Sequence, residues 1–334
     1  MTMTHLDYPV DFEQDAANLT YTFGGADPVA EVTTPAVLST STLDAYAGRL
    51  SDRSLRPTDV DFGGFLNPQT GPFLVHGASP GDTLAIHFRS ITPHFDYGIS
   101  AFLPFFGALS STPQTPTLQR PLDDRAWHYA IDTAAKTVRM DALDSGHSFT
   151  FDLDPMHGTV GVAPAAGEVH SSLTPGAWGG NMDTPEMREG ATCYLGVNVP
   201  GAMFSVGDGH ARQGEGESCG TAVETAMDST VVLDVVHDYV TPWPRIENDR
   251  YIMTTGSARP MEDAFRIAHT QMVYWIAELT GMSNSDSYQF VSQASLTPVA
   301  NAVDTNYTVV CKIDKRHLNG VQAYDGMHAR LKNA

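Results

Sequence analysis

Glycine and proline interrupt this chain so often that, over most of its length, only short stretches between them can form regular secondary structure. The 334 residues include 29 Gly and 21 Pro, and both are scattered rather than clustered. Short apolar runs bounded by such turn-forming residues are typical of β-strands. We therefore predict strands over Val29–Thr34, Gly71–His76, Thr83–Ile91, Trp127–Asp132, Thr137–Met140, Ser148–Leu153, Thr192–Val199, Ala222–Val236 and Tyr307–Ile313.

Thr83–Ile91 carries the clearest strand pattern. Leu84, Ile86 and Phe88 are two residues apart, so a strand places them on one face and the residues between them on the other. The sequence Ser-Pro-Gly-Asp directly before this stretch is a strong turn signal. The pattern predicts a strand that begins at a tight turn and has one wholly apolar face.

One long helix is predicted over Met261–Leu279. Its apolar residues recur at steps of three and four, acidic residues occupy its first turn, and Gly281 follows its last turn. A second, short helix is predicted over Ser285–Ser292. With strands first and helices late, the chain is expected to be an α+β protein, mainly β. The apolar stripe of the long helix consists of Phe265, Ala268, Met272, Trp275 and Ile276, and we assign it to core packing.

Charge and cysteine content exclude several classes of partner. The chain has 39 acidic and 19 basic side chains, a formal charge of −20, so we expect no nucleic-acid binding. No window of eighteen apolar residues is present, so we expect no membrane span. The three cysteines are Cys193, Cys219 and Cys311. An odd number of widely spaced cysteines, without an apolar leader, predicts reduced thiols and a cytoplasmic location.

Acidic and histidine side chains are concentrated between glycines in residues 177–224. Within this segment, Asp208 and His210 are two residues apart, and an extended chain projects both to one side. A carboxylate with an imidazole suits zinc or a similar divalent ion, and Asp183 could close the site from a neighbouring loop. The structural alternative is that Asp208 is a turn residue and that Glu217, like Glu215, is solvated.

Several motifs in this chain resemble those of the acetamidase/formamidase family. The longest is GGNMD followed by VPGAMFSVGDGHARQGEGE and AVE, within residues 179–224. GPFLVHGASPGDTLAIHF, PMHGTVGVAPAAGEV, STLDAYAGRL and SQASLTPVANAV are similar to further stretches of that family. The likeness spans about residues 18–316, with the motifs in the family's order.

The resemblance implies a jelly-roll-like β-sandwich core with additional α/β elements and a C-terminal helix. It implies one unit over residues 1–334, with possible subdomains at about 18–150 and 151–316, and a homodimer or higher homo-oligomer. It also implies hydrolysis of short amides to acid and ammonia, with a divalent metal in some members. The family residues that match are Asn181, Asp183, Asp208, His210, Gln213, Glu217 and Glu224.

Two positions depart from the family pattern. Trp178 stands directly before GGNMD where the family usually has His, and His76 stands where it often has Glu. His76 could replace a ligand or be a packed loop residue. We expect the substrate to contact Trp178, Gly179, Gly180 and Gln213. The Ser-, Thr- and Pro-rich segment Leu109–Arg125 is expected to be a surface loop near the rim of the pocket.

The working hypothesis is attack of metal-activated water on an amide carbonyl. Zinc is the expected ion, with calcium as an alternative. Glu217 is the expected general base. The developing oxyanion is expected to be bound by Asn181 or by backbone N–H groups near Gly179 and Gly180. The expected metal ligands are Asp208, His210, Asp183 and Glu224.

Three alternatives remain open at the level of sequence. In a metal-free hydrolase, Glu217 or Asp44 would activate water, or Cys219 would act as a nucleophile. In a non-catalytic jelly-roll protein, Trp178 would stack on a ligand. In a third alternative the substrates are larger than acetamide, such as lactams, carbamates or aromatic amides. An apolar acyl group would be favoured if the pocket is lined by Phe95, Tyr97, Phe105 and Phe106.

Overall fold

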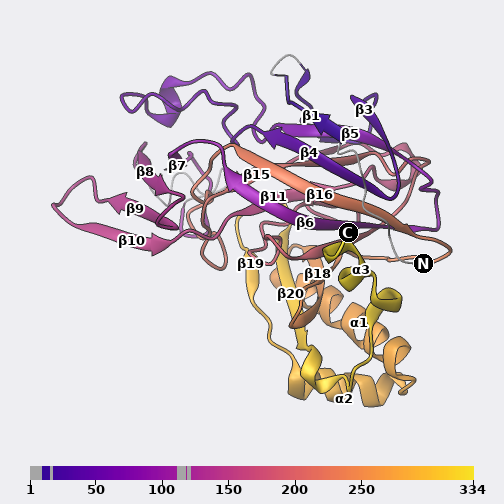
Figure 1. Cartoon of the computed structure of the whole chain (residues 1–334). Helices are drawn as coiled ribbons and strands as arrows, with labels where there is room; N and C mark the ends of the chain where they lie inside the picture. Colours follow the sequence, from indigo (N-terminus) through magenta and orange to yellow (C-terminus); the bar gives the residue numbers. More distant parts are fainter. Residues whose placement is uncertain (1–9, 16–17, 111–117, 119–121) are drawn as a thin grey trace.

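A computed structural model describes residues 10–15, 18–110, 118 and 122–334 of the chain (Figure 1). Within these residues nine strands form the largest sheet, in the order β1-β4-β16-β6-β14-β17-β18-β20-β19. The pairs are antiparallel except that β1 runs parallel to β4. The strands are β1 (Val10–Phe12), β4 (Ala36–Thr42), β16 (Met227–Val236), β6 (Thr83–Pro93), β14 (Thr192–Gly196), β17 (Arg245–Glu247), β18 (Tyr251–Ala258), β20 (Tyr307–Asp314) and β19 (Val299–Asn301).

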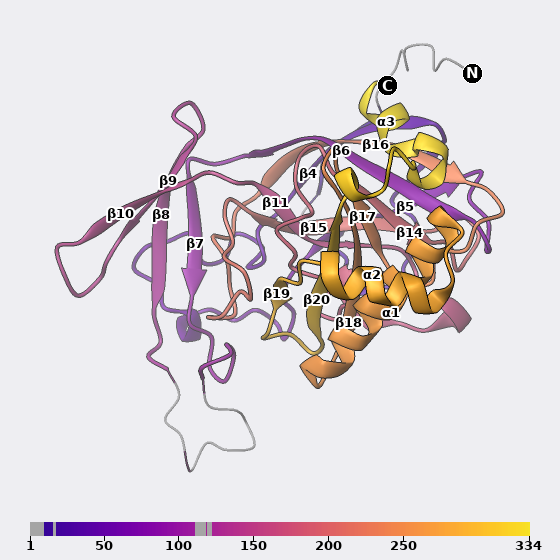
Figure 2. The same cartoon turned by 90° about the horizontal axis from the view of Figure 1, so that it is seen from below.

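The second large sheet carries the candidate site. In the described residues it has five strands in the order β13-β11-β15-β5-β3, namely Gly179–Asn181, Met156–Gly161, Phe204–His210, Gln69–His76 and Ala30–Thr33. A four-stranded sheet, β10-β9-β8-β7, projects from the body as an arm (Figure 2). Its strands are Ser148–Asp152, Thr137–Asp141, Ala126–Asp132 and Tyr97–Ala101, and β12 (His170–Ser171) pairs with β2 (Thr22–Phe23) elsewhere.

One apolar core lies between the two large sheets. Leu38, Ile86 and Leu233 of the nine-stranded sheet share a buried cluster with Phe73 and Val206 of the five-stranded sheet. Alternation along the strands explains this, because each strand turns every second side chain toward the facing sheet. The mainly β architecture predicted from the sequence is therefore confirmed, and the jelly-roll character stays a prediction.

Three helices pack on the outer side of the nine-stranded sheet (Figures 1 and 2). They are α1 (Met261–Thr280), α2 (Asn284–Ala294) and α3 (Met327–Lys332). Ala268 and Trp275 of α1 and Val291 of α2 form a second buried cluster with residues of β18 and β20. None of the described helices is long and apolar enough to cross a membrane.

Most of the predicted elements are confirmed, with ends that shift by a few residues. The predicted helix over Met261–Leu279 is α1, and Gly281 ends it in a left-handed conformation. The second helix is α2, and each predicted strand is present as β3, β5, β6, β8, β9, β10, β14, β16 or β20. Leu84 and Ile86 face the core between the sheets, as the alternation predicts.

Two differences matter for the site. The predicted strand Ala222–Val236 begins only at Met227, because residues 222–226 cross the site as irregular chain. Strands β4, β7, β11 and β15 were not among those predicted. Most of the segment Leu109–Arg125 lies outside the described residues. The division at about residue 150 stays a prediction, and both halves supply strands to the two large sheets.

Candidate active site

Strands β15 and β11 bring Asp208 and His210 to one place. Their ladder pairs Thr159 with Gly207 and His157 with Gly209, so that Gly158 lies beside Asp208. A Cβ on Gly158 would lie 2.4 Å from Oδ2 of Asp208, 2.3 Å from Oδ1 of Asp183 and 2.9 Å from Cε1 of His210. The missing side chain of this glycine therefore provides the space in which the polar groups meet.

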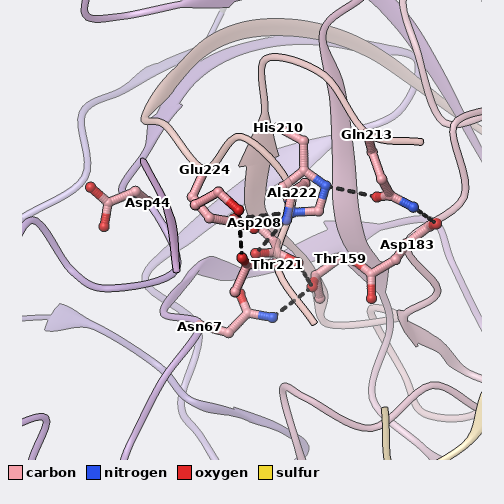
Figure 3. Close-up of polar contacts among 12 residues, drawn as sticks. Asp44, Asn67, Thr159, Asp183, Asp208, His210, Gln213, Thr221, Ala222 and Glu224 are labelled. Carbon is pink, nitrogen blue, oxygen red and sulfur yellow. Dashed lines mark hydrogen bonds and ion pairs between the residues drawn. The ribbon is translucent and has the colours of Figure 1, made fainter. Parts of the chain in front are cut away.

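His210 is fully buried between two carboxylates. Its Nε2 lies 3.4 Å from Oδ1 of Asp208 and 3.1 Å from Oε2 of Glu224. Glu224 reaches the site from the irregular segment before β16, where it pairs with Ile99 and His210 in isolated bridges. The two expected ligands Asp208 and His210 thus converge, and Glu224 joins them (Figure 3).

Gln213 fixes the orientation of His210. The Gln213 Nε2 donates to the backbone oxygens of Asp183 (2.5 Å) and Ala300 (3.1 Å), so its Oε1 faces Nδ1 of His210 at 2.9 Å (Figure 3). Because an amide oxygen only accepts, Nδ1 of His210 carries the hydrogen. The lone pair or proton of Nε2 is then directed at the carboxylates. Gln213, expected to contact the substrate, is instead a positioning residue for His210.

Asp183 and Asp304 face the cluster from the other side. The side-chain Nδ2 of Asn181 donates to Oδ2 of Asp183 (2.8 Å) and to Oδ2 of Asp304 (2.9 Å). Asn301 donates to the same two carboxylates, at 3.4 and 3.2 Å. Both amide hydrogens of Asn181 are taken, so the structure does not support its expected role as oxyanion donor. Asn181 holds the carboxylates in place.

Burial and crowding of like charges shift the pKa values of the cluster. Burial raises the pKa of Glu217 and of Asp183 well above the usual range, and raises those of Glu224 and Asp304 to about 7. Burial alone would lower the pKa of His210, but the carboxylates of Glu224 and Asp208 raise it well above its usual value. Such opposed shifts in one buried cluster are typical of functional sites.

Three of these carboxylates are held on strained backbone. The φ angles of Asp183, Asp208 and Glu217 are +44°, +56° and +45°, in the left-handed region that residues with a Cβ seldom adopt. Each costs of order 1 kcal/mol or more, which the surrounding structure must offset. Convergence of three such residues on one histidine is an independent sign of a functional site.

A cavity of about 260 Å³ opens beside the cluster. Within the described part of the chain, four carboxylates and no lysine or arginine line it, and its remaining wall is mostly apolar. The lining residues are Ala45, Tyr46, Leu66, Asn67, Leu103, Pro104, Phe106, Leu173, Asn181, Asp208, Glu217, Gly220, Thr221, Glu224 and Asp304. A larger, more open groove of about 570 Å³ runs along α1 and α2, but no carboxylate lines it.

Several expected site residues lie outside this cavity. Trp178 stacks on His170 with ring centroids 4.0 Å apart, and neither it nor Gly179 nor Gly180 lines the cavity. Gly179 donates its backbone N–H to Gly176, so it is not an oxyanion donor. Gly179 and Gly180 belong to β13, which pairs with β11, and the expected substrate contacts at these three positions stay a prediction.

Other candidates are also placed elsewhere. His76 is exposed at the end of β5 and bonds Glu31 (2.7 Å), so it is not a ligand of this site. Asp44 accepts the backbone N–H groups of Tyr46 and Gly48 and lies apart from the cluster in Figure 3. The thiol of Cys219 donates to the backbone oxygen of Thr221, and no histidine contacts it among the described residues.

The aromatic residues expected at the rim divide in two groups. Phe106 lines the cavity. Phe95 and Phe105 are partly exposed, and Phe95 stacks on Tyr97 with centroids 5.2 Å apart, outside the lining. The sequence analysis missed Tyr46, Asn67 and Asp304, which line the cavity from distant segments. The motif STLDAYAGRL contains Tyr46, but nothing in its residue pattern indicates a functional role for this tyrosine.

The donor atoms at the centre of the cluster fit a divalent cation. Nε2 of His210, Oε2 of Glu224 and Oδ1 of Asp183 are buried and make no hydrogen bond of normal geometry among the described residues, although the first two lie 3.1 Å apart. Two groups, Asp183 with Asp208 and His210, and His210 with Glu217 and Glu224, each place ligand atoms within 4.8 Å of one another. Buried polar atoms without partners are costly, and one cation would satisfy all three.

Comparison with known proteins places this geometry in a family. The model of the Acetamidase/Formamidase family matches residues 98–305. An acetamidase structure from Yersinia enterocolitica is 35% identical, with a TM-score of 0.86 over 95% of this chain and 96% of that chain. An acetamidase structure from Bacillus halodurans is 27% identical, with a TM-score of 0.83 over 94% of this chain and 100% of that one.

A curated relative is more distant. A candidate formamidase of Schizosaccharomyces pombe is 25% identical over 213 residues. That match includes 50% of this chain and 51% of the relative, so the chain covers about half the length of the curated protein it matches.

Proposed function

The chain belongs to the acetamidase/formamidase family, and on that premise we propose that it is a hydrolase that cleaves the C–N bond of small amides. The observation that carries the proposal is the buried cluster of His210 with Asp183, Asp208, Glu217 and Glu224, three of whose carboxylates line a cavity. The product of such a reaction is a carboxylic acid with ammonia or an amine. The named relatives, two acetamidases and a candidate formamidase, support this substrate class.

We assign a divalent metal, with zinc as the expected ion, to His210, Asp208, Asp183 and Glu224. Imidazole nitrogen with carboxylate oxygens is a zinc ligand set, whereas calcium prefers oxygen ligands alone. Gln213 supports the assignment, because it directs the Nε2 lone pair of His210 into the cluster. When bound, such an ion lowers the pKa of water and polarises a carbonyl oxygen.

Glu217 is our assignment for the general base. Among the described residues its carboxylate has no hydrogen bond or ion pair with another side chain, although it lines the cavity. Glu217 accepts a proton as the water oxygen adds to the carbonyl carbon. It then delivers that proton to the nitrogen as the C–N bond breaks. Burial raises the pKa of Glu217, which makes its carboxylate a stronger base than an exposed glutamate.

The apolar part of the cavity indicates the acyl group. Leu66, Leu103, Phe106 and Leu173 line the same cavity as the carboxylates. A short aliphatic or aromatic acyl group fits this wall better than a charged one, because it removes apolar surface from water. Lactams and carbamates stay alternatives on the same site. A cytoplasmic location and a homo-oligomeric assembly, with the jelly-roll description of the sandwich, also remain proposals.

Metal analysis with an amidase assay tests this function. Purified protein is expected to contain about one divalent ion per site and to release ammonia from acetamide or a short aliphatic amide. Chelation should abolish turnover, and zinc should restore it. Glu217→Gln should lower kcat by about 10²–10⁴-fold while the metal content stays unchanged. Full turnover by metal-free protein would exclude the metal assignment, and no turnover of any small amide would exclude the activity.

A further inference from the structure

The cavity wall offers few groups that can donate a hydrogen bond to a substrate. Its four carboxylates accept hydrogen bonds when they are ionised. Cleavage of an amide places negative charge on the former carbonyl oxygen, which these carboxylates repel. A donor on the wall is therefore needed besides any cation. Among the described residues, the side chains on the wall with an N–H or O–H are Tyr46, Asn67, Asn181 and Thr221.

Three of these four donors are already used. Nδ2 of Asn67 donates to Oγ1 of Thr159 and to Oδ1 of Asn181, both at 2.9 Å. Asn181 donates both hydrogens to carboxylates, as described above. The hydroxyl of Thr221 donates to the backbone oxygen of Ala101 (3.1 Å). None of the three can serve a substrate without giving up a buried hydrogen bond.

The hydroxyl of Tyr46 differs from these donors. It is buried, and it makes no hydrogen bond of normal geometry among the described residues, although the Thr221 hydroxyl is close enough to lower its pKa as a donor. The Tyr46 ring is 2% exposed and packs with Leu50, Ile99 and Ala101. Asp44 fixes the backbone by accepting the N–H of Tyr46 at 2.9 Å. The phenol is thus rigidly held at the cavity with its O–H unused.

From this inventory of donors we infer that Tyr46 is a catalytic residue whose hydroxyl donates to the substrate's carbonyl oxygen as that oxygen becomes an oxyanion. This inference rests on the proposed amide hydrolysis. Burial raises the pKa of Tyr46 well above its usual value and the charge of Glu224 raises it further, while the nearby Thr221 hydroxyl offsets only part of the shift. The phenol therefore remains protonated and acts as a donor.

Tyr46→Phe tests the inference, because it removes one oxygen and keeps the packed ring. With acetamide as the substrate, kcat is expected to fall by about 10²–10³-fold while KM changes little, as for loss of an oxyanion donor. The midpoint of thermal unfolding should stay the same or rise, because an unpartnered buried hydroxyl is removed. Bound metal, measured on the same sample, should be unchanged.

Tyr194→Phe is the matched control. Tyr194 is also fully buried, but its hydroxyl donates to Glu247 (2.8 Å) in the large sheet. This variant should lose thermal stability and keep its kcat. If Tyr46→Phe keeps kcat within about twofold, or loses stability as Tyr194→Phe does, the inference is overturned. If the wild-type protein hydrolyses no amide, the proposed function itself is wrong. That result comes from the wild type alone and is therefore distinct from a failure of the inference about Tyr46.

Discussion

Hydrogen-bond partners fix the orientation of individual side chains in this site. Gln213 shows this most directly, since its amide is locked by the backbone oxygens of Asp183 and Ala300 and so can only present oxygen to His210. Such a neighbour sets the tautomer and the direction of a ligating imidazole. The chemistry of His210 therefore depends on a side chain that does not line the cavity.

Gln213→Ala is expected to weaken zinc binding about 10–100-fold, because His210 loses the acceptor that orients it. Titration of metal-free protein with zinc measures this. Asn198→Ala is the control, since Asn198 also donates to a backbone oxygen, that of Ala163 (3.1 Å), but lies outside the cavity lining. It should change stability alone. Equal zinc affinity in Gln213→Ala and wild type would show that His210 needs no such support.

Residue patterns predicted part of the site. The spacing of Asp208 and His210 predicted that they converge, and the structure brings Asp183, Glu217 and Glu224 to the same place. The sequence did not predict the stacking of Trp178 on His170, because its position before GGNMD does not indicate what its ring contacts. Asp304 and Tyr46 were missed, since only the tertiary fold brings residues so distant in sequence together.

At the scale of elements, the site depends on how closely β11 and β15 approach. Gly158 of β11 leaves the space that the carboxylates of Asp183 and Asp208 occupy. The strain at Asp208 (φ +56°) lies in β15 directly beside it. A strand with an ordinary side chain at this position would have to move away, and the ligands would separate.

Gly158→Ala is therefore expected to abolish most zinc binding and amide turnover, and to destabilise the fold by about 1–3 kcal/mol through overpacking. Metal content, ammonia release and urea unfolding measure the three effects. The control is Gly146→Ala in the β9–β10 hairpin, where a Cβ meets no atom within 4 Å. It should behave as wild type. A fully active Gly158→Ala variant would mean that the carboxylates do not need this space.

For the whole molecule, the sequence predicted the kinds of elements but not their pairing. The alternation of Leu84 and Ile86 predicted a strand, and it is present. Strand β4 (Ala36–Thr42) pairs with β16 (Met227–Val236), although the paired residues are almost 200 positions apart in the sequence. No local pattern encodes such a pairing. The same long-range contacts join the C-terminal helix α3 to the sheet, through His87, Thr192 and His328.

This contact predicts how the stability of the whole protein depends on pH. His87 is buried, and its Nδ1 shares the Thr192 hydroxyl with Nδ1 of His328, at 2.9 and 2.8 Å. Burial, together with the charges of His328, Arg89 and Lys332, lowers the pKa of His87 to about 4, while Asp249 opposes this shift. The folded protein therefore holds His87 neutral at pH values where the unfolded chain already binds a proton.

The lowered pKa of His87 makes the folded state less stable at acid pH. Well above the ordinary histidine pKa of about 6.5 neither state is protonated at His87, and as the pH falls through that value toward 4 only the unfolded state gains a proton, so stability is lost. For a pKa shift of this size, the free energy of unfolding falls by at most about 3 kcal/mol. Urea unfolding of wild type and His87→Gln at several pH values between 7.5 and 4 should show their difference in unfolding free energy shrinking toward acid. A difference that is constant over this range would mean that His87 is not held neutral, and that the link between α3 and the sheet does not respond to acid.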